Sequence, residues 1–589
     1  MCGISGIINH YSPDLGDLDS IKKMNERLRL RGPDAENIWN SNNKKVYLGH
    51  TRLSIIDPNQ SSNQPLIDNK NNLVITYNGE LYNYKELRKD LVSLGYEFNT
   101  NSDTEVILKL YICYGEKMFD LMMGMFAFCI FDQKNNTFLI ARDNYGIKPL
   151  YYYNDSNKFV FSSQIKSIIQ CSSINKEISP VGVCSFFING SVVEPHTMYK
   201  NIYAVNPGSY IIIRNDKIIK NTYYSLANHI QNVRDTNKSN LRVDNEISNA
   251  LDMSVKRHLV SDVPVVLYLS SGIDSSAILN SINNVSNEKI NTISMGFDIY
   301  KNSNLDEINL SRKISNAYNT NSNFTYQDKN DFFRLKNDII LNMDQPSIDG
   351  INTYMISNFA NKLGYKVAIS GIGGDEIFSG YPTFRDVPLM HKIYKNTFIS
   401  KNISNIFKQS TSAILDKLNL RKLSFFYDYS DTFTGAYFLR RALFMSNELY
   451  SFLPKKFVDE GLEIFNQILI DDANVLQIKD DITKVTYLEF KYYLKNQLLK
   501  DADWAGMANS VEIRVPFIDK EFIDKSLKIN FFKKLHKNLL IQTIDEPVKS
   551  MVENRKKTGF MIPVSNWINS HKNTYHSWSK EIMSEYNIF

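Results

Sequence analysis

Three features of this 589-residue chain predict an α+β first half followed by an α/β second half with a parallel sheet and a helical C-terminal part. Up to about residue 210, short apolar or alternating segments bounded by turn residues indicate strands. Beyond about residue 240, short strands alternate with long helical patterns, which is typical of a two-sided parallel sheet. The segment between is polar and rich in Asn and Lys. We therefore expect domains at 2–210 and 241–589, joined by a linker at 211–240.

The expected strands of the first half are short, and turn residues bound most of them. They lie at 3–8, 46–49, 73–77, 126–131, 138–141, 150–153 and 159–162. Two stretches, 18–29 and 104–114, have apolar residues on one face and predict amphipathic helices. Pro207-Gly208 marks a turn near the end of this half.

The second half opens on a nearly continuous apolar strand at 263–269, which is typical of a strand buried on both faces. Similar short strands are expected at 290–297 and 366–370, each followed by a polar turn. Residues 385–500 are predicted to be almost wholly helical. This alternation favours a parallel sheet covered by helices on both faces.

The composition excludes several classes of protein. Lys plus Arg is 68 and Asp plus Glu is 63, so the net charge is only +5, and no long basic block indicates nucleic-acid binding. No apolar run approaches the ~20 residues of a membrane span, and the chain does not open on a signal peptide. We expect a soluble, cytoplasmic protein. The five cysteines form no C-x-x-C pair, and neither they nor the nine histidines have zinc-ligand spacing.

Cys2 differs from the other cysteines because of its position. Removal of Met1 would leave a residue that carries both a thiol and a free α-amine. The α-amine has a reference pKa of about 7.7–8.0, so it can act as a base near neutral pH. A nucleophile beside its own amine is the arrangement of N-terminal-nucleophile enzymes.

The surrounding motifs support this interpretation. They are MCGISGI at 1–7, RGPD at 31–34, HTRLSIID at 50–57, YNGE at 77–80, NSDTE at 101–105, GMFAF at 124–128 and ARDNYGIKPLY at 141–151. In this order and spacing they resemble the class II glutamine amidotransferase domain, over residues 2 to about 210. The resemblance implies an N-terminal-nucleophile glutaminase fold, with stacked antiparallel sheets between helices.

The resemblance also implies roles for individual residues. Cys2 would attack the side-chain amide of glutamine, and the Asn78 side chain with the Gly79 backbone N–H would bind the resulting oxyanion. Arg52 would bind the substrate's α-carboxylate. Asp103, with Glu80 beside it, would bind the α-ammonium group. The charged residues of 31–34 and 142–143 are expected to form turns and ion pairs that support the fold.

A second motif follows the first strand of the second half. Residues 270–276 read SSGIDSS and open a helix, and such a loop presents backbone N–H groups and hydroxyls to phosphate. The loop lacks the glycine and lysine spacing of a Walker A motif. It resembles the PP-loop of ATP pyrophosphatases, which split ATP into AMP and pyrophosphate.

Downstream motifs extend this second resemblance. They are SGIGGDEIF at 370–378 with Gly380-Tyr381, DADWAGMANSVEIRVPFID at 501–519 and RKKTGF at 555–560. Together they resemble the synthetase domain of glutamine-hydrolysing asparagine synthetases, over about 240–570.

That family implies ligands for the second site. Residues Ser270, Ser271, Gly272, Asp274, Ser275 and Ser276 would bind the pyrophosphate part of ATP, and Leu269, Met295, Ser370 and Gly371 would surround AMP. Asp274 and Asp375 are hard carboxylates that suit Mg²⁺ beside a triphosphate. Lys557 aligns with the family's active-site lysine, which stabilises charge on the phosphate and acyl centre. The implied ligands are glutamine, ATP with Mg²⁺ and an acceptor carboxylate, with no nucleic acid and no membrane span. The sequence leaves open whether the protein forms a homodimer.

The implied reaction makes an amide through an acyl-adenylate, with ammonia passed from the glutaminase site along an internal path. Two departures from the family leave the acceptor open. Ser271 stands where a glycine is usual, and Ile372 stands where asparagine synthetases commonly carry a glutamate. The runs at 346–350 and 503–505 resemble members that amidate sugar uronates.

L-Aspartate is therefore the default acceptor, and a sugar uronate or another carboxylate is the alternative. A third hypothesis, a non-catalytic nucleotide sensor, is disfavoured by the retention of Cys2, Asp274 and Lys557.

Overall fold

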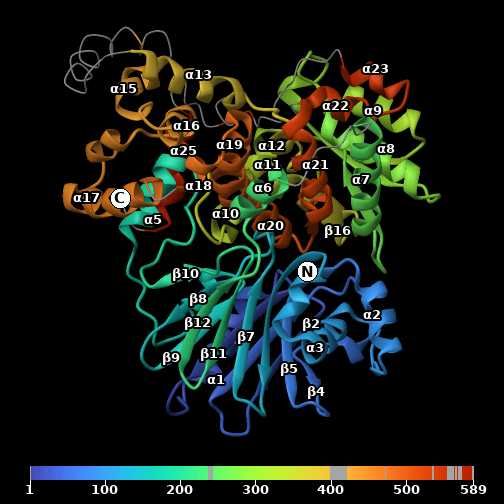
Figure 1. The fold of residues 1–589 in the computed structure, drawn as a ribbon, viewed down its shortest axis with the longest axis vertical. Coiled ribbons are helices and arrows are strands. Elements are labelled where there is room, and N and C mark those ends of the chain that lie inside the picture. Colours follow the sequence, from blue (N-terminus) through green and yellow to red (C-terminus); the bar gives the residue numbers. More distant parts are fainter. Residues whose placement is uncertain are drawn as a thin grey trace.

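The computed structural model describes residues 2–235, 243–397, 415, 421–470, 473–533, 536–553, 563, 567 and 574–586. Figure 1 shows two stacked halves, with the sheet-rich first half below and the mainly helical second half above. The chain begins where the two halves meet. This position places Cys2 beside the second half.

Two antiparallel sheets of six strands form the middle of the first half. The first is ordered β10 (Ile202–Ala204), β8 (Tyr151–Asn154), β9 (Lys158–Ser162), β1 (Gly3–Asn9), β3 (Val46–Arg52) and β2 (Ala35–Asn40). The second is ordered β12 (Lys217–Thr222), β11 (Ser209–Arg214), β7 (Thr137–Arg142), β6 (Gly124–Asp132), β5 (Leu73–Leu81) and β4 (Leu66–Asp68). The helices are α1 (Asp17–Leu28), α2 (Tyr84–Ser93), α3 (Asp103–Tyr114), α4 (Ile165–Ile168) and α5 (Pro180–Asn189).

The two sheets enclose an apolar core that includes Ile4, Leu48, Val74 and Cys129. On the outer faces, α1 packs on β1 and β3, whereas α3 packs on β5. The result is the expected stack of antiparallel sheets between helices.

The expected strands of this half are present, with ends that shift by a few residues. The pattern did not predict β2 and β4, because β2 is mostly exposed or half-buried and β4 has only three residues. The segment expected to be a linker contains most of β11 and all of β12, which pair in register from Ser209↔Thr222 to Arg214↔Lys217. Ile211 and Ile213 of β11 are buried in the core between the sheets, because they belong to the apolar run at 210–213 that precedes the polar sequence.

Within the described residues, the second half contains one parallel sheet of five strands. Its order is β15 (Asn321–Gln327), β14 (Asn291–Phe297), β13 (Val265–Tyr268), β16 (Val367–Ile369) and β17 (Glu512–Arg514). The central strand β13 comes first along the chain. Strands β14 and β15 follow on one side of it, and β16 and β17 then lie on the other side. The order therefore reverses between β13 and β16, and such a switch point is where open α/β sheets bind ligands.

Helices make up most of the remaining chain. Around the sheet lie α7 (Val243–His258), α8 (Ile273–Val285), α9 (Glu307–Ala317), α10 (Lys329–Asn342), α11 (Ile351–Lys362), α12 (Gly374–Ile377), α20 (Lys500–Met507), α21 (Lys520–Lys533), α22 (Lys537–Ile541) and α23 (Val548–Glu553). The others are α6 (Leu226–Asp235), α13 (Thr383–Asn396), α15 (Phe426–Tyr429), α16 (Phe433–Arg441), α17 (Lys455–Ile470), α18 (Ala473–Gln477), α19 (Asp481–Leu488), a π-helical segment at Glu489–Leu499 and α25 (Thr574–Ser584).

The helical content predicted for 385–500 is thus confirmed wherever that range is described. In the ranges covered by the structure, none of the helices combines the length and the apolar character needed to cross a membrane.

Candidate active sites

Cys2 lies at the start of the central strand β1 and is buried. Its backbone N–H donates to Asn78 Oδ1 at 3.0 Å, and its carbonyl accepts from Arg31 Nε at 3.1 Å. Burial raises the pKa of the Cys2 thiol, while the Leu53 N–H and the Arg52 charge oppose that shift. The thiol thus needs a base to ionise, which a freed α-amine on the same residue would supply.

Asn78 is held in one orientation by Cys2. Its Oδ1 is occupied by the Cys2 backbone, so its amide Nδ2 is held in one direction. That buried Nδ2 has no hydrogen-bond partner among the described residues. A buried N–H without a partner is costly, and an oxyanion formed beside Cys2 would satisfy it.

Gly79 follows on β5, where it pairs with Phe126 of β6. A Cβ at position 79 would lie 2.1 Å from Met125 O. This close approach requires a glycine and keeps the adjoining backbone rigid.

Arg52 and Asp103 are both buried and already hydrogen-bonded. Arg52 donates from Nη1 to Asn59 O at 2.9 Å and to Asn63 Oδ1 at 2.7 Å. Asp103 Oδ2 accepts from Tyr77 OH at 2.9 Å and from the Leu81 N–H at 3.0 Å. These bonds hold both charged side chains in fixed positions.

Glu80 adds a second buried carboxylate. Burial and the nearby Glu512 raise its pKa well above the usual range, although Arg514 opposes them. Burial also raises the pKa of Asp103. Both carboxyl groups would be stabilised by an added cation, as a substrate ammonium group would provide.

The phosphate-loop candidate lies between β13 and α8. Gly272 is the N-cap of α8, so the first backbone N–H groups of the helix point out of its end. Ser275 Oγ bonds to Ser270 O at 2.8 Å and to Ser270 Oγ at 2.9 Å. The Gly272 N–H donates to Ser270 Oγ at 3.1 Å, which tightens the loop further.

A pocket of about 350 Å³ opens at the carboxyl ends of β13 and β16. Most of the predicted ATP residues line it, namely Leu269, Ser270, Asp274, Ser275, Met295, Ser370 and Gly371. Ser271, Gly272 and Ser276 belong to the same loop but do not line the pocket. The strand register Leu267↔Ile369 explains why two loops about 100 residues apart in sequence share one pocket.

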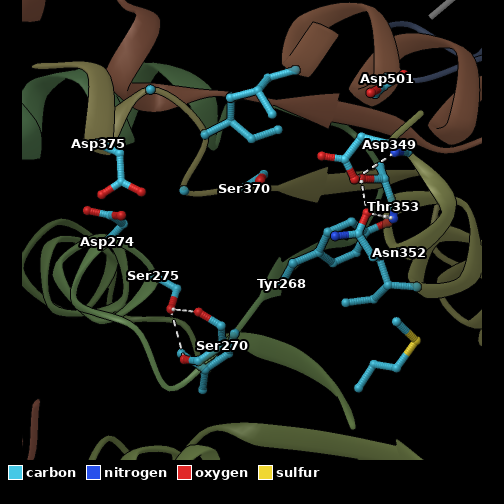
Figure 2. A pocket seen from close by; sticks show the side chains of 18 of the residues that line it. Tyr268, Ser270, Asp274, Ser275, Asp349, Asn352, Thr353, Ser370, Asp375 and Asp501 are labelled. Atoms are coloured by element: carbon cyan, nitrogen blue, oxygen red, sulfur yellow. Dashed lines mark hydrogen bonds between the residues drawn. The ribbon is translucent and has the colours of Figure 1, made fainter. Parts of the chain in front are cut away.

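Asp274 and Asp375 face each other across one end of this pocket (Figure 2). Lys537, at the start of α22, forms ion pairs with both: its Nζ bonds to Asp274 Oδ1 and lies 2.8 Å from Asp375 Oδ1. Burial lowers the pKa of Lys537, but the two carboxylates more than offset it, so the pKa is raised and the lysine is charged.

Lys537 was not predicted, because it is one of several lysines in a basic stretch. Lys557, the lysine that was predicted, lies outside the described residues.

The other end of the pocket has a different lining. Figure 2 places Asp349, Asn352, Thr353 and Asp501 there, with Ser370 between the two ends. Asp501 accepts from Trp504 Nε1 at 2.7 Å and from Ser347 Oγ at 2.9 Å. Burial and the nearby Asp349 raise the pKa of Asp501 well above its usual range.

Ile372 also lines the pocket and adds an apolar surface. Glu376, another lining residue, was not predicted: burial and Asp375 raise its pKa to about 7, and it accepts from Tyr381 OH at 2.8 Å. The pocket thus contains a carboxyl group able to exchange protons near neutral pH.

Buried ion pairs connect the two sites across the boundary between the halves. Arg31, which contacts the Cys2 carbonyl, forms a bidentate pair with Asp503 of α20 at 2.6 and 3.0 Å. Arg514 of β17 lies 3.3 Å from Glu80 Oε2, and its carbonyl accepts from the Ser370 N–H at 2.9 Å. Each site therefore contacts an arginine that also contacts the other half.

Comparison with known proteins agrees with this arrangement. A family model described as "Glutamine amidotransferase domain" matches residues 1–224, and one described as "Asparagine synthase" matches residues 246–588. The chain belongs to the asparagine synthase family. As a member of that family it is a glutamine-dependent carbon–nitrogen ligase.

Curated relatives share its full length. "Asparagine synthetase [glutamine-hydrolyzing] 1" of Bacillus subtilis is 31% identical over 99% of this chain and 90% of its own length. "Amidase chry2" of Gibberella zeae is 28% identical over 96% of this chain and 90% of its own length, so relatives with different names share both domains. A solved glutamine phosphoribosylpyrophosphate amidotransferase from B. subtilis aligns weakly, with a TM-score of 0.31 and 14% identity over 56% of this chain and 92% of that chain.

Proposed function

We propose that this synthase-family member hydrolyses glutamine at Cys2 and uses the ammonia to amidate a carboxylate that it activates with ATP. The observation that carries the proposal is the pairing of two sites in one chain. One is a buried cysteine beside an orphaned Asn78 amide, and the other is a phosphate-loop pocket with Asp274 and Asp375 at the switch point of a parallel sheet.

The glutaminase step begins with a base. After removal of Met1, the α-amine of Cys2 takes the thiol proton, and the sulfur attacks the glutamine side-chain amide. Asn78 Nδ2 and the Gly79 N–H donate to the oxyanion, Arg52 binds the α-carboxylate, and Asp103 and Glu80 bind the α-ammonium. Ammonia leaves, water hydrolyses the thioester, and glutamate is released.

In the second site the acceptor carboxylate attacks the α-phosphorus of ATP and pyrophosphate leaves, giving an acyl-adenylate. Ammonia then displaces AMP, and the nitrogen loses a proton as the amide forms. The loop at 270–276 would bind the pyrophosphate part, and Leu269, Met295, Ser370 and Gly371 would surround AMP. Lys557 would stabilise the charge that develops on the phosphate and the acyl centre.

Mg²⁺ fits the charge pattern of this pocket. Asp274 and Asp375 already share one cation, the Lys537 ammonium, so the position between them favours positive charge. Mg²⁺ commonly binds through one or two carboxylates together with substrate phosphates. When bound, it would neutralise charge on the triphosphate.

Two acceptors are candidates. L-Aspartate follows from the names of the relatives. A sugar uronate is favoured by Ile372, because this apolar residue lines the pocket at the position where asparagine synthetases commonly carry a glutamate.

The variant Cys2→Ala tests whether glutamine hydrolysis and amide synthesis take place at separate sites. We expect it to lose glutamine hydrolysis while still releasing pyrophosphate and forming the amide from added ammonium salts. Glutamate formation and pyrophosphate release are measured separately, with the wild-type protein as control. Normal glutamine hydrolysis by the variant would contradict the assignment of the nucleophile.

A further inference from the structure

A second cavity adjoins the pocket at the carboxyl ends of β13 and β16, which we call the nucleotide pocket. It has a volume of about 420 Å³ and is lined by Asn189, Ile348, Asp349, Lys422, Tyr437, Arg441, Ala442, Leu443, Tyr493, Gln497, Tyr575 and His576. We call it the side cavity. Asp349 lines both spaces, so they meet at this residue. The Arg441 guanidinium lies over Tyr381 of the pocket at 4.5 Å and over Tyr493 of the cavity at 3.8 Å.

Basic residues gather around Lys422 in the lining of the side cavity. Arg421, Lys422, Arg440 and Arg441 come together there from the segment that begins at 421 and from the end of α16. Three of them have carboxylate partners: Arg421 pairs with Glu448, Arg440 with Asp386 and Arg441 with Glu489.

Lys422 has no such partner in the described part of the chain. The contact recorded for its Nζ there is a long one, 3.4 Å to Arg440 O. Burial, with the neighbouring Arg440, Arg421 and Arg441, lowers the pKa of Lys422 to about 8. A half-buried cation beside other cations would be stabilised by an anion placed in the cavity.

The rest of the lining suits a hydroxylated ring. Tyr437, Tyr493 and Tyr575 supply aromatic surface, whereas Asn189, Gln497 and Asp349 supply amide and carboxyl groups for hydroxyls. An apolar and aromatic wall with a few polar groups is the usual composition of a small-molecule site. The cavity volume lies within the range of ~300–1,000 Å³ found for drug-sized ligands, whereas the small L-aspartate would leave most of it empty.

We propose that the acceptor is a cyclic sugar acid bearing a phosphate, with its reacting carboxylate in the nucleotide pocket, its ring beside Asp349 and its phosphate on Lys422. The proposal rests on the proposed amidation and selects the second of the two acceptors. The phosphate is part of either a sugar 1-phosphate or a nucleotide diphosphate sugar, because both present the same anion to Lys422.

The test compares pyrophosphate release by the full-length protein with four acceptors: L-aspartate, a free hexuronate, its 1-phosphate and its nucleotide diphosphate form. We expect the phosphorylated acceptors to have the highest kcat/KM. Lys422→Ala should lower that value about 10- to 100-fold, the loss of one charge-assisted hydrogen bond. The value for free hexuronate should stay unchanged, and the two phosphorylated forms identify the source of the phosphate.

Three controls accompany this comparison. Lys456→Ala removes an exposed lysine of α17 and should change nothing. Lys422→Arg keeps the charge and should retain most of the activity. Glutamine hydrolysis by each variant shows that the first half is folded, and the value for free hexuronate shows that the second half is.

The outcomes separate the two proposals. If L-aspartate is the best acceptor, or if Lys422→Ala affects free and phosphorylated acceptors equally, the side-cavity proposal is wrong and the amidation proposal stands. If no acceptor releases pyrophosphate while glutamine hydrolysis persists, both proposals are wrong.

Discussion

One side chain is central to each of the two sites. These are Asn78, whose Nδ2 has no hydrogen-bond partner among the described residues, and Lys537, which forms ion pairs with two carboxylates. The first is a donor without an acceptor among the described residues, beside a buried thiol. The second is a cation between Asp274 and Asp375, where it offsets the repulsion between the two carboxylates. The first arrangement favours binding of an oxyanion, whereas in the second the position between the two carboxylates favours positive charge.

Lys537→Ala tests the second arrangement. Loss of the cation leaves Asp274 and Asp375 uncompensated beside a phosphate, so we expect pyrophosphate release to fall about 100-fold or more, as when one charge-stabilising group is removed. Glutamine hydrolysis should persist, and Lys537→Arg should recover part of the lost rate.

Lys525→Ala is the matched control, because this lysine of α21 is exposed and is expected to have no effect. A normal rate of pyrophosphate release by Lys537→Ala would show that the reaction does not need Lys537.

At the scale of elements, the site depends on how closely two loops approach each other. A Cβ at Gly374 would lie 2.5 Å from Asp274 Oδ1, and one at Gly380 would lie 1.9 Å from Asp375 Oδ1. The glycines around α12 therefore leave room for the two carboxylates. The same loop carries Ser370 and Ile372, so its path determines the shape of the whole pocket.

Gly380→Ala is predicted to displace the Asp375 side chain. We expect a large loss of pyrophosphate release, with a thermal unfolding temperature close to that of the wild-type protein. Gly16→Ala is the control, because the nearest atom to a Cβ there is 3.5 Å away. If the Gly380 variant is fully active, the position of Asp375 does not matter for the reaction.

At the scale of the whole molecule, the two halves share buried charges. Glu194 of the first half lies 3.0 Å from Arg142 Nη1 and also faces Lys500 and Lys495 of the second half, at 3.5 and 3.8 Å. Burial raises the pKa of Glu194, but these cations outweigh it and lower the pKa to about 2. Removing one member of a buried ionic cluster leaves the others uncompensated.

Glu194→Gln should therefore lower the free energy of unfolding by about 3–5 kcal/mol at pH 7. Because the folded-state pKa lies below the ordinary 4.5, the wild-type contribution is present above pH 4.5 and is lost as the pH falls through about 2. Denaturant unfolding at pH 7 and pH 3 measures both effects, since the difference between the variant and the wild-type protein should shrink at the lower pH.

Glu177→Gln, at an exposed ion pair with Lys200, should change little and serves as the control. An equal stability of Glu194→Gln and wild-type protein at pH 7 would contradict the role of the cluster.

Much of the fold was predictable because local patterns and tertiary packing agree. The strands at 3–8, 73–77 and 290–297 are apolar and bounded by turns, and they appear as β1, β5 and β14. Strands β15 and β17 were not predicted, because β15 is polar and only half-buried and β17 carries Glu512 and Arg514. Those two charged side chains are buried because they pair with each other at 2.6 Å.

The sequence by itself determined the two-domain composition, the family and most of the loop that would bind phosphate, since these depend on residues that are neighbours along the chain. Only the tertiary structure revealed the Lys537 bridge, the Arg31–Asp503 and Arg514–Glu80 pairs and the side cavity at Lys422. Each joins side chains from distant segments. Whether a charge at such a position is exposed and inert or buried and functional depends on the partners that folding brings to it.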